Sequence, residues 1–258
     1  MLPRACGKLV SRISRAASLA GLLLLLPIPL NAEPAQTRIV CRIDINQVHR
    51  EELANKLRKI TGWTDLKFDR SGFLRLGTKE PVSGSQTARE LLKRTIAGKN
   101  VIVLEDASKN PDVAFSRVVE VRWKHETPGS PPAFVVQIDF DDFKHVIGDK
   151  RAVEAFNEGW VLLHEFDHVV NESDDADKLG ETGECESHIN QMRSECGLPE
   201  RADYFFTYLP HADAAHMTRL VRLAFAERTD NRKKRYWLVW DARLVGGVDE
   251  TKQIAALR

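Results

Sequence analysis

The chain has few cysteines, few tyrosines and no excess of charge of either sign. It contains four cysteines and three tyrosines in 258 residues, and its formal net charge is +1. Lysine and arginine are spread among aspartate and glutamate along the chain, which is not the pattern of a nucleic-acid-binding protein. Only one long apolar run is present, so the sequence offers no second hydrophobic span. The rest of the composition is that of an ordinary globular protein.

The single apolar run lies near the N-terminus. Residues 1–18 carry four basic residues and no acidic residue, and they lead into the apolar run Leu19–Leu30, which is followed by Asn31 and Ala32. A run of about 12 residues is too short to cross a bilayer as a stable helix. The pattern resembles a secretory signal peptide over residues 1–32. Leu30 departs from the small residue usual at its position, so an uncleaved anchor is the alternative.

The remaining chain, residues 33–258, is predicted to form one secreted or periplasmic domain, with residues 33–80 as an optional N-terminal elaboration. It has an odd number of cysteines, so at least one must stay free or pair between molecules. Cys185 and Cys196 cannot form a disulfide if they share a helix, because eleven residues of helix rise about 16 Å. Pairing of Cys41 with either of them stays open.

Hydrophobic periodicity and turn residues predict a mixed α and β protein. Strands are predicted over 38–45, 66–69, 73–76, 101–104, 134–140 and 236–240, and helices over 51–60 and 83–96. Ser83 and Gln86 have the spacing of a capping box at the start of the second helix. The basic cluster Arg232–Arg235 is interpreted as a charged turn before the last strand.

The middle of the chain carries the motif His164-Glu165-Phe166-Asp167-His168. Residues four apart lie on one helix face, so the imidazoles of His164 and His168 can bind one Zn²⁺ while Glu165 lies beside its open position. Apolar residues before the motif recur at the intervals of a buried helix: Val153, Phe156, Trp160 and Leu163. The motif therefore predicts a zinc hydrolase site, with two histidines on a solvated helix as the alternative.

Zinc needs a third protein ligand, and several downstream carboxylates are candidates. Glu186 is preferred, because Glu186, Asn190 and Arg193 fall at i, i+4 and i+7. On one helix face, a ligand and its hydrogen-bonding neighbours would all point at the metal. Asp174, six residues after His168, would instead give a metzincin-like spacing. The remaining candidates are Glu181 and Glu184.

The segment after the motif resembles part of a known enzyme group. Its pattern is Glu186-x-x-x-Asn190-x-x-Arg193-x-Glu195-x-Gly197-Leu198-Pro199-x-Arg201-x-x-Tyr204. This is similar to the segment after the zinc helix in effector-type and Rhs-associated toxin metallopeptidases, which are bacterial zinc enzymes of the zincin type. Ser83–Arg89 and Ile138–Asp141 are similar to other parts of that group, so the resemblance covers roughly residues 83–204. Asp167 departs from the small residue usual inside the motif.

The resemblance implies a zincin-like α+β fold in which a mixed sheet places an edge strand beside the active-site helix. In zincins that strand receives the extended substrate as an additional strand, and 134–140 is the candidate for this role. The implied function is a secreted zinc metallopeptidase that acts on a protein or peptide, with no nucleic-acid partner and no membrane in the mature form. Its zinc ligands would be His164, His168 and Glu186, with Glu165 as the general base.

A further donor is needed to stabilise the oxyanion of the reaction. Among the candidates, Tyr208 and His211 are ranked above Tyr204 and His216, because they share one short segment. Asp167 is expected in solvent or at the rim of the core, since the residue before His168 points about 100° away from it, with a hydrogen bond that orients a histidine as the alternative. The alternative functions are a secreted zinc-binding protein without catalysis and a structural secreted domain.

Overall fold

The computed structural model describes residues 38–122, 129–209, 219–229 and 232–246. These residues belong to one unit, Ala35–Arg258. The predicted signal peptide, residues 1–32, lies outside the described residues. No helix in the described part of the chain is both long and apolar enough to span a bilayer.

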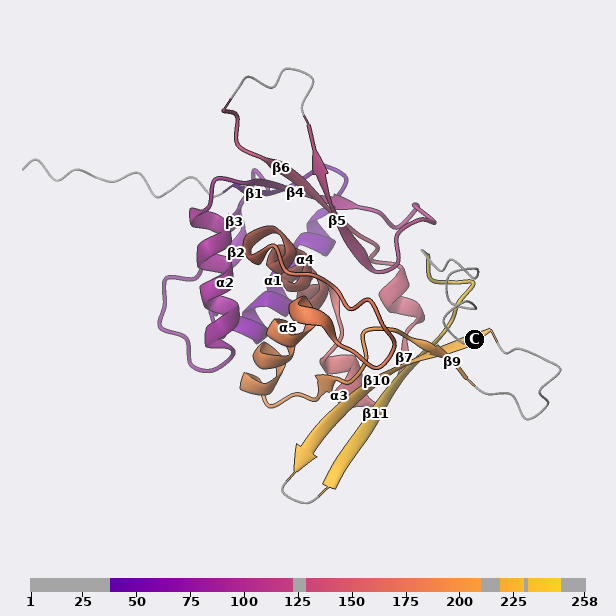
Figure 1. The fold of residues 1–258 in the computed structure, drawn as a ribbon. Helices are drawn as coiled ribbons and strands as arrows, with labels where there is room; N and C mark the ends of the chain where they lie inside the picture. Colours follow the sequence, from indigo (N-terminus) through magenta and orange to yellow (C-terminus); the bar gives the residue numbers. More distant parts are fainter. Residues whose placement is uncertain (1–37, 123–128, 210–218, 230–231, 247–258) are drawn as a thin grey trace, which may run out of the picture. The chain divides into compact units, whose positions relative to one another are not determined.

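A mixed four-stranded sheet forms one layer of the fold (Figure 1). Its order is β1 (Ile39–Cys41), β4 (Val101–Asp106), β6 (Ala133–Ile138) and β5 (Ser116–Val121). The first three strands are parallel, and β5 is antiparallel to β6. Together with five helices in the described residues, this confirms the predicted α+β class.

The prediction that 134–140 forms the edge strand is wrong, because β6 pairs with β4 on one side and with β5 on the other. The apolar run of β6 suits a strand that is hydrogen-bonded on both sides. The edge strand next to β6 is β5, which carries exposed charged side chains at Arg117 and Glu120. Charged residues of this kind are typical of edge strands.

Helices cover one face of this sheet. They are α1 (Gln47–Thr61), α2 (Gln86–Ala97), α4 (Glu158–Asn171) and α5 (Gly183–Glu195), while the short α3 (Lys150–Glu154) precedes α4. α4 packs against α1, α2 and α5 and also contacts β5 and β6. The predicted cap of α2 is displaced by two residues, since Ser85 is the N-cap and accepts the backbone N–H of Ala88.

A second sheet is built on the long antiparallel pair β10 (Leu220–Thr229) and β11 (Arg232–Asp241). Short strands complete it: β7 (Ile147–Gly148), β8 (Glu200–Arg201) and β9 (Thr207–Tyr208). The basic cluster Arg232–Arg235 is therefore the start of β11 rather than a turn. A separate hairpin, β2 (Lys67–Phe68) with β3 (Leu74–Arg75), confirms the hairpin predicted around Gly72.

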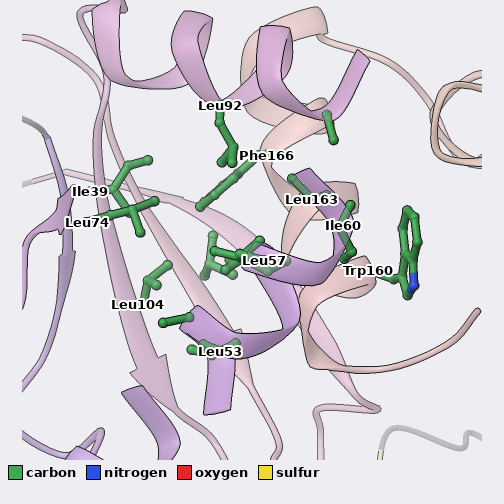
Figure 2. Packing of buried hydrophobic residues seen from close by; sticks show 14 of the residues in the cluster. Ile39, Leu53, Leu57, Ile60, Leu74, Leu92, Leu104, Trp160, Leu163 and Phe166 are labelled. Carbon is green, nitrogen blue, oxygen red and sulfur yellow. The ribbon is translucent and has the colours of Figure 1, made fainter. Parts of the chain in front are cut away.

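Two hydrophobic cores meet at α4. On one side, Leu163 and Phe166 pack with Leu57 of α1 and Leu92 of α2, beneath the first sheet (Figure 2). On the other side, Val161 belongs to a cluster formed with residues of β10 and β11. α4 is thus buried on most of its circumference, which fixes the backbone that carries the histidines.

The apolar stripe predicted before the motif does not lie on one helix. Val153 belongs to α3 and is 40% exposed. The chain then leaves the helical conformation, and Asn157 caps α4 by accepting the N–H of Gly159. An N-cap asparagine starts a new helix, so the buried stripe begins only after it.

The three described cysteines, Cys41, Cys185 and Cys196, are all free, so Cys41 pairs with neither of the others. Burial raises the pKa of Cys41 to about 12, so this thiol is a packing residue rather than a nucleophile.

Phe166→Ala should destabilise the protein by about 3–5 kcal/mol, because Phe166 is fully buried beside Leu163 and its removal leaves a cavity. Val153→Ala is the control and should change the free energy of unfolding by about 0.5 kcal/mol or less. Urea unfolding in the presence of a metal chelator measures the free energy of unfolding of both variants. Equal losses would show that Val153 shares the buried face of α4.

Candidate metal centre

α4 places the two histidines of the motif on one face, one turn apart. The Nε2 atoms of His164 and His168 lie 3.1 Å from each other. Both also approach one carboxylate oxygen, Oδ1 of Asp175, at 3.1 Å from His164 and 3.4 Å from His168. Ligand atoms of a tetrahedral zinc with bonds of about 2.0–2.1 Å are separated by about 3.3 Å. The three atoms therefore form a triangle of the size that zinc requires.

Asp175 is oriented as a ligand would be. Its Oδ1 is buried and has no hydrogen-bond partner among the described residues, although two imidazoles lie beside it. Its other oxygen, Oδ2, accepts the hydroxyl of Tyr204 at 2.7 Å. A buried polar oxygen without a hydrogen bond is costly unless a cation binds it. This orphaned atom therefore fits a metal ion.

The electrostatics of the three groups favour positive charge between them. Burial alone would raise the pKa of Asp175, but His164 and His168 hold it well below its usual value. Burial disfavours the charged imidazole of His168, yet Asp175 and Cys185 together outweigh this effect and raise the pKa of His168 to about 11. The carboxylate thus draws protons to the imidazoles, and a metal ion would exchange with those protons on binding.

The loop after α4 brings Asp175 to the histidines, and Asp167 holds that loop. Asp167 is fully buried and accepts hydrogen bonds from Asn171, from His188 Nδ1 at 2.8 Å and from Ser173 Oγ at 2.7 Å. The carbonyl of Ser173 lies 2.7 Å from Nδ1 of His168 and accepts its N–H. This hydrogen bond keeps the proton on Nδ1, so that the lone pair of Nε2 is available to a metal. The expectation that Asp167 lies in solvent or at the rim of the core is wrong, since the residue is fully buried and accepts a histidine N–H.

The other end of the loop is attached to α5. The carbonyl of Asp174 accepts the backbone N–H groups of Glu184 and Cys185, both at 3.1 Å. Gly183 allows the close approach, because a Cβ there would lie 2.4 Å from the backbone nitrogen of Ala176 and its φ is +74°. The side chain of Asp174 is exposed, whereas that of its neighbour Asp175 turns inward.

Cys185 is a fourth group near the site. The ligand atoms of His164, His168, Asp175 and Cys185 all lie within 4.8 Å of one another, and this group could hold a metal ion. The thiol is 3.3 Å from Nδ1 of His164, the ring nitrogen opposite to the one that faces Asp175. It is therefore positioned either to orient the imidazole or to complete a four-ligand site.

Glu165 follows His164 on α4 and points toward the edge of the sheet. It is 5% exposed, and its Oε1 accepts the hydroxyl of Ser116 at 2.6 Å. Ser116 is the first residue of β5. Burial raises the pKa of Glu165, which suits a carboxylate that must take up a proton.

Glu186, the carboxylate that the sequence favoured as third ligand, has other partners. It is 1% exposed, and it forms ion pairs with Arg193 and, at 3.0 Å, with Arg201. Burial alone would raise the pKa of Glu186, but the two arginines hold it well below its usual value. Its Oε2 lies 3.4 Å from Nδ1 of His164, on the side of the ring away from Asp175. The shared helix face of Glu186, Asn190 and Arg193 exists, but these residues bind one another.

The remaining candidates from the sequence fall into two groups. Glu181 and Glu184 are exposed. Among the oxyanion candidates, Tyr204 is at the site: its ring stacks on that of His164 at 6.1 Å between centroids. Tyr208 lies in β9, and the other two candidates, His211 and His216, lie outside the described residues.

Comparison of the chain with protein-family models, with curated proteins and with solved structures finds no match. The zincin resemblance therefore rests on the residues themselves, and the geometry of the site carries the functional argument.

The purified protein should bind about one Zn²⁺, and His164→Ala, His168→Ala or Asp175→Ala should each weaken binding by about 100-fold or more, since each removes one of three ligands. Asp174→Ala is the matched control, because its exposed side chain should change affinity by only a few-fold. Titration against a competing chelator measures the zinc affinity of all four variants. A large loss at Asp174 with none at Asp175 would reverse the assignment.

Asp167→Asn should lower zinc affinity by about 10- to 100-fold without touching a ligand, since the loop with Ser173 and Asp175 loses its anchor. Asp69→Asn is the control: Asp69 also accepts three hydrogen bonds, but in the β2–β3 hairpin. The visible spectrum of the Co²⁺-substituted proteins gives a second measurement, because a displaced carboxylate changes the coordination. An unaltered spectrum and affinity in Asp167→Asn would exclude this role.

Proposed function

We propose that the protein is a zinc-dependent metallopeptidase in which His164, His168 and Asp175 hold the zinc and Glu165 is the general base. The observation that carries this proposal is the triangle of Nε2, Nε2 and Oδ1 atoms, with edges of 3.1 to 3.4 Å, beside a buried glutamate. Three protein ligands leave one position for water, which is the arrangement of catalytic rather than structural zinc.

Zinc bound there would lower the pKa of a water molecule and polarise the substrate carbonyl. The residues of this chain supply the rest. Glu165 takes a proton from the attacking water as its oxygen bonds to the carbonyl carbon, and then delivers that proton to the leaving amine nitrogen. Ser116 holds the carboxylate of Glu165 in place through its hydroxyl. Tyr204 holds Asp175 in the same way.

The sheet provides a place for an extended substrate. β5 is a terminal strand of its sheet, it contacts α4, and the hydroxyl of its first residue donates a hydrogen bond to Glu165. A peptide that pairs with the outer edge of β5 would pass beside the proposed base. This arrangement supports a zincin-like fold, with β5 in the role expected for residues 134–140. Export through the signal peptide would place the enzyme outside the cytoplasm.

Cys185 favours one second candidate, a zinc-binding protein without catalysis. If its thiolate joined the three ligands, the site would be closed, as in structural zinc centres. The Co²⁺-substituted protein separates the two candidates, since a bound thiolate gives an intense sulfur-to-cobalt charge-transfer band. We expect this band to be absent and the spectrum to be the same in Cys185→Ser.

Glu165→Gln should retain zinc and should lower peptide hydrolysis by about 10²- to 10⁴-fold, because it removes the base without removing a ligand. Casein and mixed fluorogenic peptides are the substrates for this measurement. Glu184→Gln, an exposed carboxylate of α5, is the control and should keep full activity. Hydrolysis by Glu165→Gln at the rate of the unmodified protein would exclude Glu165 as the base.

A further inference from the structure

A cavity of about 270 Å³ opens beside His164 and Glu165. Its walls are largely aromatic and aliphatic, while its polar lining includes the side chains of Arg193 and Arg201. The aromatic residues of the walls are Phe115, Phe156, Trp160, Tyr204, Phe205, Phe206 and Trp240. The cavity therefore combines an apolar enclosure with cationic groups next to the proposed catalytic residues.

The two guanidinium groups have more N–H donors than the protein satisfies. A guanidinium carries five N–H groups, so the pair offers ten. Six of them are directed at acceptors of the chain: both oxygens of Glu186, the side chain of Asn190 and the carbonyls of Ala155, Asp203 and Tyr204. The other four have no oxygen acceptor among the described residues, although the guanidinium groups also lie over aromatic rings, Arg193 over Trp160 at 5.4 Å and Arg201 over Tyr204 at 4.8 Å. They include both N–H groups on Nη2 of Arg193.

The positive charges of Arg193 and Arg201 are also not fully compensated, because the two guanidinium groups share one carboxylate as ion-pair partner. Arg193 is 2% exposed, and 14% of the side chain of Arg201 is exposed. Glu186 is the one carboxylate with which both of them form an ion pair in the described structure. In the described structure, neither arginine forms an ion pair with the nearby carboxylates of Glu165 and Asp175, which accept the hydroxyls of Ser116 and Tyr204. A buried cation without a counter-charge is costly, so the lining of the cavity favours an anion with oxygen acceptors.

We infer that this cavity binds a carboxylate of the substrate, with the apolar part of that residue between the aromatic walls and the oxygens against Arg193 and Arg201. A planar guanidinium matches a carboxylate with two parallel hydrogen bonds. The carboxylate belongs either to an acidic side chain or to the C-terminus of a peptide. This inference rests on the proposed peptidase function and adds the substrate class to it.

Binding of small probes tests the inference without requiring turnover. Trp160 and Trp240 line the cavity, so their fluorescence reports its occupation. N-acetylphenylalanine is compared with its uncharged amide, and N-acetylglutamate α-amide with N-acetylglutamine amide. Zinc-loaded protein should bind at least one carboxylate probe about tenfold or more tightly than its uncharged twin. The pair that shows the difference identifies the C-terminus or the side chain as the source.

Two controls separate the arginines from the metal, to which a carboxylate also binds. The preference for the charged probe should persist in protein stripped of zinc, and it should disappear in Arg201→Gln. Arg151→Gln should leave it unchanged, because Arg151 is bonded to Glu227 and Gly197 and is not part of the cavity lining. If Arg201→Gln does not fold, Arg201→Lys replaces it and should retain only part of the preference.

Equal binding of charged and uncharged probes would overturn the inference, as would a preference that vanishes with the zinc or survives in Arg201→Gln. These results would leave the proposed function intact, since that function depends on zinc binding and on Glu165. Failure of the protein to bind zinc would instead overturn the function, while a carboxylate preference in zinc-free protein would still stand.

Discussion

The burial of α4 is the constraint on which the site depends. Leu163 and Phe166 anchor this helix under the first sheet, and Val161 anchors it against the second, so it cannot rotate without breaking one of the two cores. His164 and Glu165 lie between these anchors and are themselves at most 9% exposed. Their directions are therefore set by hydrophobic packing, and the polar chemistry is built on a backbone fixed by apolar contacts.

The parts of the site that are local in sequence could be predicted, because helix periodicity alone determines them. The four-residue spacing of His164 and His168 places their imidazoles together wherever the helix is packed. Asp175 could not be predicted in this way. It lies in a polar loop, and its inward direction depends on the anchor at Asp167 and on the close approach at Gly183. Asp174 and Asp175 look alike in sequence, and only the path of the loop decides which one faces the two histidines.

In the fold, too, the features that local sequence determines could be predicted, and those that depend on distant contacts could not. The hairpin around Gly72 and the second helix follow from turn residues and periodicity, and they are present close to the predicted positions. The order of the strands does not follow from local pattern. The apolar run 134–140 was a clear strand, but its place between β4 and β5 depends on pairing between distant segments. The break between α3 and α4 at Asn157 could not be predicted, because Val153 matches the helical period of the apolar residues that follow.

Glu186 links the two halves of the site through a single imidazole. Oδ1 of Asp175 lies 3.1 Å from Nε2 of His164, and Oε2 of Glu186 lies 3.4 Å from Nδ1 of the same ring. With the thiol of Cys185 also at Nδ1, acceptors on that side favour a proton on Nδ1 and leave Nε2 for the metal. Glu186 thus contributes to the centre as a partner of a ligand, and its remaining charge is bound to Arg193 and Arg201. An anion at these arginines would compete with the carboxylate of Glu186 for the two guanidinium groups, so occupation of the cavity and the basicity of His164 are physically coupled.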